Sequence, residues 1–277
     1  LPALEAGADA SEIATGKAYQ LLWNLVALVK LCRVTGDAGL RDTLERIWQN
    51  IRDHHLTLGG GPWGGVAHRS REVFNARGSF SPNAYVETCS LLSWIQFNRE
   101  LLRLTGEARF AEEIERTAYN DLIGAQAPDG EDWCYYSFPN GRRVHTTYWR
   151  CCKSSGAMAL EELPALAYAV EGEAVRVQLY GPGEARLAHP QAGTLMLRQH
   201  TGYPFDGEVS LDVRPEHEAT FDLYLRIPSW AEGTAVSVNG ELVDAAIVPG
   251  RFLVLRRLWR SDDHVQLAFP LRPVLHR

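Results

Sequence analysis

The periodicity of hydrophobic residues in this 277-residue chain changes once, near Gly172. Residues 1–171 repeat apolar side chains with the 3.6-residue period of amphipathic helices, whereas residues 172–277 alternate apolar and polar positions in short runs. The hydrophobic content of 45% is enough for a real core. We therefore predict a multidomain chain, with a helical domain over residues 1–171 followed by a β domain over residues 172–277.

A helical hairpin is repeated within the first domain. The segment Leu31–Asp37 (LCRVTGD) aligns with Leu101–Glu107 (LLRLTGE), and in the first copy Gly36 ends one helix while Asp37 is placed to cap the next. Repeated hairpins are typical of a stack or ring of helix pairs. The expected helices span Glu12–Thr35, Leu40–His54, Thr88–Leu104 and Gly156–Val170, the last kinked at Pro164. The first carries an apolar stripe of Tyr19, Leu22, Trp23, Val26 and Val29.

The second domain is predicted to be an antiparallel β-sandwich. Its apolar residues recur with period two, and turn signals such as Asn239-Gly240 separate the runs. The expected strands are Val175–Tyr180, Thr194–Gln199, Glu208–Val213, Thr220–Ile227, Ala235–Val238, Phe252–Arg256 and Val265–Phe269.

Charge and composition exclude several classes of partner. The net charge is −6 and no basic stripe is present, which argues against nucleic acid. The longest apolar stretch, Leu21–Val29, contains Asn24 and is too short to span a membrane. Five cysteines, two of them adjacent, do not make the even, spaced set of a disulfide framework. We therefore expect reduced thiols and a cytoplasmic protein.

A carboxylate and three thiols stand at two helix starts. Glu87 and Cys89 flank Thr88 where the chain enters a predicted helix, and Cys151-Cys152 lies just ahead of another. Residues two apart do not share a helix face, but both can turn towards one ion where the chain is still extended. The helix N-termini, together with Arg150 and Lys153, are expected to lower the thiol pKa values. Three thiolates and one carboxylate suit tetrahedral zinc, although buried cysteines that pack as small apolar residues remain an equal alternative.

Other features carry weaker signals. Cys32 and Met158 fall on helix faces and are expected in the core, whereas Cys134, beside Tyr135 and Tyr136, belongs either to the core or to a wall that stacks on a sugar. The glycine-rich stretch Gly59–Gly65 lacks the context of a phosphate loop, and we interpret it as a mobile loop bordering a pocket.

Several segments together resemble one known family, the β-L-arabinofuranosidases of glycoside hydrolase family 127. The likeness covers nearly the whole chain, and the combination of Glu-x-Cys with Cys-Cys is specific to this family and its close relatives. The matching segments include Glu72-Val73-Phe74, Tyr85-Val86-Glu87-Thr88-Cys89, Ala127-Pro128-Asp129-Gly130, Tyr136-Ser137-Phe138-Pro139, Cys151-Cys152 and Leu225-Arg226-Ile227-Pro228-Ser229-Trp230.

The resemblance implies a fold and a set of roles. The fold is an (α/α)₆ barrel followed by β-sandwich domains. Cys151 matches the nucleophile, Glu72 the general acid/base, and Tyr136 a tyrosine near the sugar. The zinc ligands match Glu87, Cys89, Cys151 and Cys152. Only about five barrel helices can be read here, whereas the ring needs twelve, so the chain resembles the C-terminal portion of a longer enzyme.

The chemistry is consistent with these roles. A retaining glycosidase needs a nucleophile at the anomeric carbon and an acid at the leaving oxygen, and zinc would keep Cys151 deprotonated. Burial is expected to raise the pKa of Glu72. A surface ion pair of Glu72 with Arg69 or Arg71 is the alternative that its neighbours alone favour.

Two functions follow from this reading. The first is a zinc-dependent retaining glycoside hydrolase that releases L-arabinofuranose or a related sugar through a cysteine thioglycoside. The second is a non-catalytic carbohydrate-binding or scaffold fragment of such an enzyme, with a structural zinc. Carbohydrate is the expected partner in both, and a homo-oligomer formed through the β-sandwich is left open.

Overall fold

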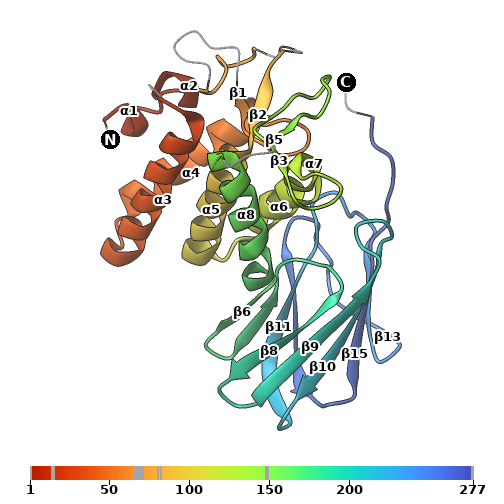
Figure 1. The fold of residues 1–277 in the computed structure, drawn as a ribbon. Helices are drawn as coiled ribbons and strands as arrows, with labels where there is room; N and C mark the ends of the chain where they lie inside the picture. Colours follow the sequence, from red (N-terminus) through yellow and green to blue (C-terminus); the bar gives the residue numbers. More distant parts are fainter. Residues whose placement is uncertain are drawn as a thin grey trace. The chain divides into compact units, whose positions relative to one another are not determined.

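The computed structural model describes residues 2–13, 16–64, 72–79, 81, 83–146 and 150–275. These residues form two compact units (Figure 1). The first contains Leu1–Gly106 and Glu113–Leu163, and the second contains Glu107–Glu112 and Pro164–Arg277. A helical region followed by antiparallel sheets confirms the predicted fold class. In the described part of the chain, no helix combines the length and the hydrophobicity needed to cross a membrane.

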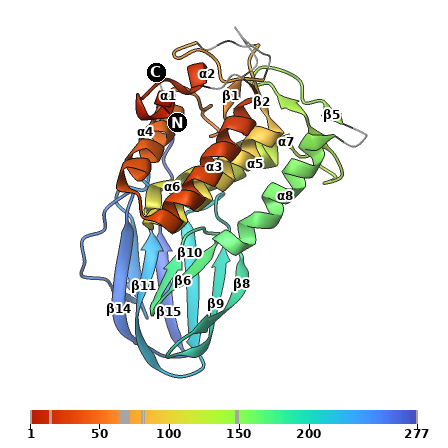
Figure 2. The same cartoon turned by 90° about the vertical axis from the view of Figure 1, so that its left-hand side faces the viewer.

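Helices dominate the first unit. Helices α3 and α5, the first members of the two predicted hairpins, pack directly against each other (Figure 2). Gly36 and Gly106 end them in the same left-handed conformation, at φ 68° and 69°, and each donates its N–H to a carbonyl one turn earlier. The helices are α1 (Pro2–Glu5), α2 (Ala10–Ile13), α3 (Ala18–Thr35), α4 (Ala38–His54), α5 (Thr88–Thr105), α6 (Ala108–Thr117), the π-helical η1 (Ala118–Leu122), α7 (Ile123–Ala125) and α8 (Cys151–Leu166).

Several helix predictions need correction. The helix expected over Glu12–Thr35 is two helices, α2 and α3, and Trp23 in the predicted apolar stripe is 39% exposed because its indole points to Gln96 at the surface. The last helix begins at Cys151, earlier than expected, and ends at Leu166 because the chain then enters strand β6 (Tyr168–Glu171). Met158 is 53% exposed, so its placement in the core was wrong.

Short strands join the helical elements to one another. A three-stranded sheet has the order β1-β2-β4 and a two-stranded sheet pairs β3 with β5. In the first sheet, Glu87 pairs with Tyr136 and Val86 pairs with Ser137. The strands are β1 (Trp63–Gly64), β2 (Tyr85–Glu87), β3 (Trp133–Cys134), β4 (Tyr136–Ser137) and β5 (His145–Thr146).

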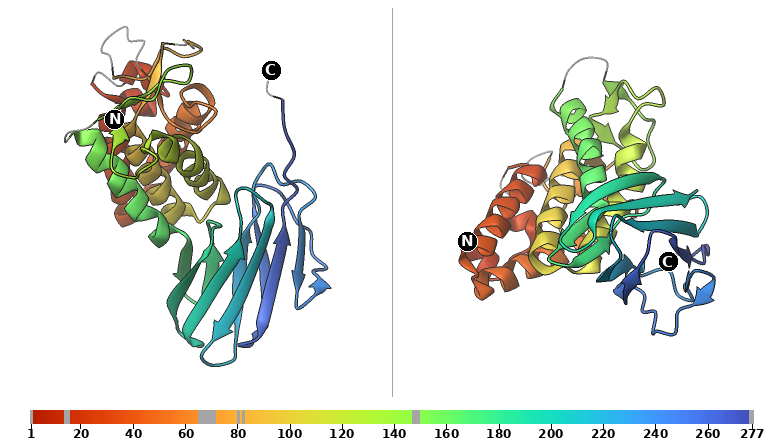
Figure 3. Two further views of the ribbon diagram at one scale, coloured as in Figure 1. Left: turned by 45° about the vertical axis from the view of Figure 1, so that its right-hand side comes forward. Right: turned by 90° about the horizontal axis from the view of Figure 1, so that it is seen from below.

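The second unit contains two larger sheets, which form its layers (Figure 3). One has the order β13-β12-β15-β10-β9-β8 and the other the order β14-β11-β7-β6. All pairs are antiparallel except β7 with β11. Buried residues alternate along the strands, as in Leu211 and Val213 on β10 and Leu223 and Leu225 on β11. The strands after β6 are β7 (Ala174–Val177), β8 (Gly183–His189), β9 (Gly193–Thr201), β10 (Glu208–Pro215), β11 (Ala219–Arg226), β12 (Ala235–Val238), β13 (Glu241–Leu242), β14 (Phe252–Trp259) and β15 (Asp263–Ala268).

Candidate active site and metal centre

The four predicted metal ligands converge on one point of the helical unit. Glu87 ends β2 in an extended conformation, with φ −86° and ψ 131°, and Cys89 lies in the first turn of α5. Cys151 and Cys152 open α8, which is held against α5 by the Glu162 carboxylate as it accepts hydrogen bonds from Gln96 and Arg99. One ligand atom from each residue lies within 4.8 Å of all the others. The change from strand to helix at Glu87 allows two residues only two positions apart to face the same point, as the sequence predicted.

Hydrogen bonds link the members of this cluster. The Cys89 and Cys152 sulfurs are 3.4 Å apart, and the Ser155 hydroxyl donates to the Cys89 sulfur at 3.2 Å. The Cys152 thiol lies 3.9 Å from Glu87 Oε1. Glu87 is 3% exposed, and its Oε2 has no hydrogen-bond partner within the described part of the chain. A buried carboxylate oxygen without a partner carries a large desolvation cost, which a cation would offset.

The protonation states of the four groups are strongly perturbed. Burial raises the pKa of Glu87 to about 9, and the nearby Glu72 and Cys89 charges act in the same direction. The hydrogen bond with Cys152 lowers the pKa of Cys89 to about 6, and the same contact raises the pKa of Cys152 above its ordinary value. The group thus holds one thiolate and shares the remaining protons, because four negative charges cannot be confined there without a cation.

The donor set therefore fits a metal ion. Glu87, Cys89, Cys151 and Cys152 offer one oxygen and three sulfurs, the number and type of ligands found in tetrahedral sites for soft or borderline metals. Glu87, Cys89 and Cys152 are buried, whereas Cys151 is exposed. The group could thus bind a metal while leaving one of its sulfurs accessible from solvent.

The cations flanking Cys151 do not activate it as expected. Burial raises the pKa of the Cys151 thiol, although the Tyr135 hydroxyl opposes this effect. Lys153 is instead engaged with Asp132, at 2.7 Å between Nζ and Oδ1. The pKa of the Cys151 thiol is thus raised, whereas its flanking cations had predicted that it would be lowered.

Glu72 lies near the cluster and is only partly exposed. It forms an ion pair with Lys17 and accepts a hydrogen bond from the Tyr136 hydroxyl. Burial acts to raise the pKa of Glu72, but these two contacts outweigh it, so the pKa lies below its ordinary value. The expected upward shift was wrong because a sequence neighbourhood cannot reveal Lys17, 55 positions away. Arg69 and Arg71, the alternative partners, lie outside the described residues.

The Tyr135 hydroxyl connects Glu72 to the thiol cluster. It lies 3.4 Å from Glu72 Oε1 and 3.6 Å from the Cys151 sulfur. Cys151 and Glu72 thus contact the same hydroxyl group. The structure therefore places a thiol and a carboxylate within reach of one another through a single hydroxyl group.

Three residues of this site were not predicted from the sequence. Tyr135 contacts both Cys151 and Glu72, Lys17 pairs with Glu72, and Ser155 donates to Cys89. Ser155 was detectable in principle, because it follows Cys152 by three positions and so lies one helical turn away. Nothing in the sequence around Lys17, in the break between α2 and α3, indicates its role.

The remaining predicted residues are now placed. Cys134 is fully buried, which assigns it to the core, and its carbonyl accepts a hydrogen bond from the Thr88 hydroxyl at 2.7 Å. Cys32 is buried, as expected. Tyr136 lies with its ring against Tyr85, at 3.9 Å between centroids. Two residues of the glycine-rich stretch, Gly59 and Trp63, do border a pocket, and Gly65 lies outside the described residues.

Comparison with known proteins identifies relatives over almost the whole chain. Residues 8–165 match the β-L-arabinofuranosidase GH127 catalytic domain, and residues 174–271 match the GH127 middle domain. A non-reducing end β-L-arabinofuranosidase from Bifidobacterium longum subsp. longum is 25% identical over 94% of this chain. The chain spans 41% of the length of that relative.

Solved structures agree with the family match. A GH127 β-L-arabinofuranosidase from Geobacillus stearothermophilus T6 superposes with a TM-score of 0.82 at 28% identity, over 92% of this chain and 42% of that one. A second solved GH127 β-arabinofuranosidase gives 0.84 at 29% identity, over 92% and 43%. The chain therefore belongs to the GH127 β-L-arabinofuranosidase family of glycoside hydrolases.

Proposed function

We propose that this chain belongs to a zinc-dependent retaining glycoside hydrolase that releases L-arabinofuranose or a related sugar. The observation that carries the proposal is the placement of Cys151, an exposed thiol within the Glu87–Cys89–Cys152 cluster, beside the hydroxyl that also contacts Glu72. The named activity of the relatives supports the choice of sugar. Because the chain spans about two fifths of those relatives, the activity is proposed for the whole protein.

Zinc would be held by Glu87, Cys89, Cys151 and Cys152. Sulfur ligands favour it over magnesium and calcium, which prefer oxygen. When bound, zinc would deprotonate the coordinating thiols and so offset the raised pKa values of Cys151 and Cys152.

The chain's own residues would perform a double displacement. The Cys151 sulfur attacks the anomeric carbon as the bond to the leaving oxygen breaks, and Glu72 delivers a proton to that oxygen. Glu72, now ionised, takes a proton from water, whose oxygen attacks the anomeric carbon and breaks the carbon–sulfur bond. The ion pair with Lys17 favours the ionised form of Glu72, which suits the second step. For the first step Glu72 must gain a proton, and a sugar that separates it from Lys17 would raise its pKa.

Tyr136 is proposed to contact the sugar. Its hydroxyl donates to Glu72, and its ring packs on Tyr85. A tyrosine fixed in this way can orient the leaving oxygen toward the Glu72 carboxyl group, which is a positioning contribution to the barrier.

The test uses aryl β-L-arabinofuranosides with the whole protein loaded with zinc. We expect Cys151→Ser to abolish turnover, whereas Cys32→Ser, which removes a buried thiol outside the cluster, retains it. Mass spectrometry of the quenched reaction should detect a pentosyl adduct on the Cys151 peptide. Turnover that survives in Cys151→Ser refutes the nucleophile role.

The dependence of the rate on the leaving group distinguishes an acid role of Glu72 from a structural one. Glu72→Gln should slow the hydrolysis of a phenyl glycoside strongly but that of a dinitrophenyl glycoside much less, because a good leaving group needs little protonation. A uniform loss across leaving groups would contradict an acid role.

A non-catalytic carbohydrate-binding or scaffold fragment with a structural zinc is the second candidate. The share of the relatives that the chain covers favours it, because a barrel site built from part of the helices lacks some sugar contacts. Chelation should then unfold the protein, whereas a catalytic metal should be removed with loss of activity first. Sugar binding without turnover by the zinc-loaded chain would support this candidate.

We also propose a reducing compartment, the cytoplasm, for this protein. All five cysteines are free, including the adjacent pair.

A further inference from the structure

A second cavity lies in the helical unit, apart from the thiol cluster. Its volume is about 490 Å³, within the range of sites for small molecules. The end of α4, the glycine-rich loop after it, the η1 segment and the residues that follow β4 line its walls. The cluster residues Glu87, Cys89, Cys151 and Cys152 are not among its lining residues.

The cavity and the proposed active site use opposite faces of the same small sheet. Successive side chains of a strand point to opposite faces. Glu87 and Tyr136, which pair across β2 and β4, face the thiol cluster and Glu72. Val86 and Ser137, the next pair, line the cavity. The two sites are therefore back to back, with one layer of backbone between them.

Ser137 supplies a polar group that lacks a partner. The residue is 3% exposed and lines the cavity, and its Oγ has no hydrogen-bond partner among the described residues. Buried hydroxyl groups nearly always form a hydrogen bond, because an unsatisfied one costs free energy. A polar ligand in the cavity would satisfy this hydroxyl.

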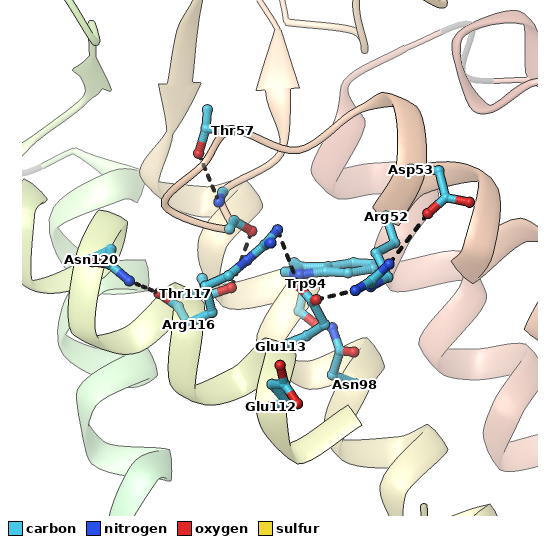
Figure 4. Close-up of polar contacts among 12 residues, drawn as sticks. Arg52, Asp53, Thr57, Trp94, Asn98, Glu112, Glu113, Arg116, Thr117 and Asn120 are labelled. Atoms are coloured by element: carbon cyan, nitrogen blue, oxygen red, sulfur yellow. Dashed lines mark hydrogen bonds and ion pairs between the residues drawn. The ribbon is translucent and has the colours of Figure 1, made fainter. Parts of the chain in front are cut away.

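Two arginines of the cavity wall share one carboxylate. Arg52 reaches Glu113 from α4, at 3.2 Å between Nε and Oε1, and Arg116 approaches Oε2 from within α6, at 3.4 Å (Figure 4). Glu113 is 2% exposed, so it anchors both guanidinium groups from beneath. Together with Asp53, which lies 3.4 Å from Arg52 on the solvent side, Glu113 balances the two positive charges.

Arg143 adds a cation that is not committed elsewhere. It is exposed, lines the cavity, and forms no ion pair with any other residue that the structure describes. Its guanidinium group lies over Gly124, where an added Cβ would be 3.3 Å from Nη2. Gly124 thus leaves space for a cation at the cavity mouth.

Asp121 supplies an acceptor that is fixed in advance. Its Oδ2 accepts hydrogen bonds from the Thr57 hydroxyl at 2.5 Å and from the Gly61 N–H at 2.7 Å. Gly61 has to be glycine here, because a Cβ would lie 2.6 Å from that oxygen. The remaining lone pairs of Asp121 are available to hydroxyl groups of a ligand.

We propose that this cavity binds a monosaccharide that carries an anionic group, as a site separate from the thiol cluster. Trp63, Phe138 and Pro139 present apolar surface to the C–H face of the sugar ring. Arg143, which forms no ion pair within the described part of the chain, receives the anionic group. Ser137 and Asp121 pair with the sugar hydroxyls.

Titration calorimetry with glucuronate, glucose and glucose 6-phosphate tests the proposal on this chain. We expect saturable binding of glucuronate that is at least about tenfold tighter than binding of glucose, because a charged hydrogen bond is lost with the neutral sugar. Tighter binding of glucose 6-phosphate would assign the anion as a phosphate rather than a carboxylate. Equal affinity for glucose and glucuronate, or no saturable binding of any of the three, overturns the proposal.

Matched variants locate the binding. Arg143→Gln should weaken glucuronate binding by about tenfold or more, whereas Arg142→Gln, which changes an exposed neighbour that does not line the cavity, should leave it unchanged. Ser137→Ala should weaken both charged and neutral sugars by several-fold. Both cavity variants should keep the metal content of the parent chain, and Cys152→Ala should keep glucuronate binding. An unchanged affinity in Arg143→Gln refutes the assignment.

Discussion

The two compact units bury charged groups in different ways. In the β unit, Arg226 is fully buried, and its Nε donates to the Gln178 carbonyl at 2.6 Å. Its guanidinium group also lies over the Tyr180 ring, whose hydroxyl donates to the Arg226 carbonyl at 2.6 Å. In the helical unit, Glu87 is almost as inaccessible, yet one of its oxygens has no partner in the described chain and its neighbours include thiols. Arg226 Nε and the face of its guanidinium group find partners within their own unit, whereas Glu87 Oε2 has none among the described residues and is open to a group from outside.

The buried cysteines of the helical unit also differ from one another in their surroundings. Cys32 and Cys134 are buried singly, and they pack as small apolar residues. Cys89 and Cys152 are buried as a pair, 3.4 Å apart, and the pKa of Cys89 falls to about 6. Neither burial nor a shifted pKa alone distinguishes a structural thiol from a ligand, because burial raises the pKa of Cys32 as well, but the mutual proximity of Cys89 and Cys152 does.

The largest expected effect is the loss of metal binding. Cys89→Ala or Cys152→Ala should weaken zinc binding by at least about 100-fold, because either change removes one of four ligands. Cys32→Ala and Cys134→Ala serve as controls and should bind zinc like the parent chain. Metal content measured by mass spectrometry after dialysis checks both pairs. If all four variants retain zinc equally, the distinction between the two kinds of buried cysteine fails.

The pH dependence of metal affinity is the next largest effect. In the metal-free chain the pKa of Glu87 is about 9, so near neutral pH it holds a proton that the metal must displace. The affinity should therefore rise with pH, about tenfold per pH unit for each proton released, and the rise should continue past pH 9, because the pKa values of the Cys151 and Cys152 thiols are also raised. Competition titrations between pH 6 and pH 8 measure the slope. A flat profile would mean that neither the carboxyl group nor the thiols release a proton when the metal binds.

A variant in the β unit tests whether a buried charge there contributes to stability and not to metal binding. Arg226→Met should lower the free energy of unfolding by about 1–3 kcal/mol, because the buried Gln178 carbonyl loses its donor. The metal content should not change. Chemical denaturation together with metal analysis checks both expectations, and a stability equal to that of the parent would show that the guanidinium contacts contribute nothing net.

The smallest expected effect concerns a cap at the surface of the helical unit. Asp37 accepts the Leu40 N–H at 3.0 Å and caps α4. Asp37→Ala should cost about 1 kcal/mol in unfolding free energy, and Asp37→Asn, which can still cap, should recover most of it. Zinc binding should be the same in both variants. A change in zinc affinity would show that the cluster responds to distant changes in helix stability.

Local sequence patterns predicted many of the elements well. The cap at Asp37, the left-handed glycine at Gly36 and strand β12 over Ala235–Val238 were found where expected, because each depends on neighbouring residues. Strand β8 over Gly183–His189 was missed, since its burial alternates only weakly. Met158 was misplaced because a helical period does not say which face meets a partner.

The sequence by itself determined the two-part architecture, which follows from a local rule, the change of hydrophobic period. It named the four members of the cluster through the family resemblance, because donor types at helix starts left packed cysteines as an equal alternative. The tertiary structure alone decided that Lys17 and Tyr136 hold Glu72 ionised and that Tyr135 contacts both Glu72 and Cys151. It alone placed Ser137 and Arg143 at a second cavity behind the same sheet. The reason is that electrostatic and hydrogen-bond partners depend on distance in space, which separation along the chain does not encode.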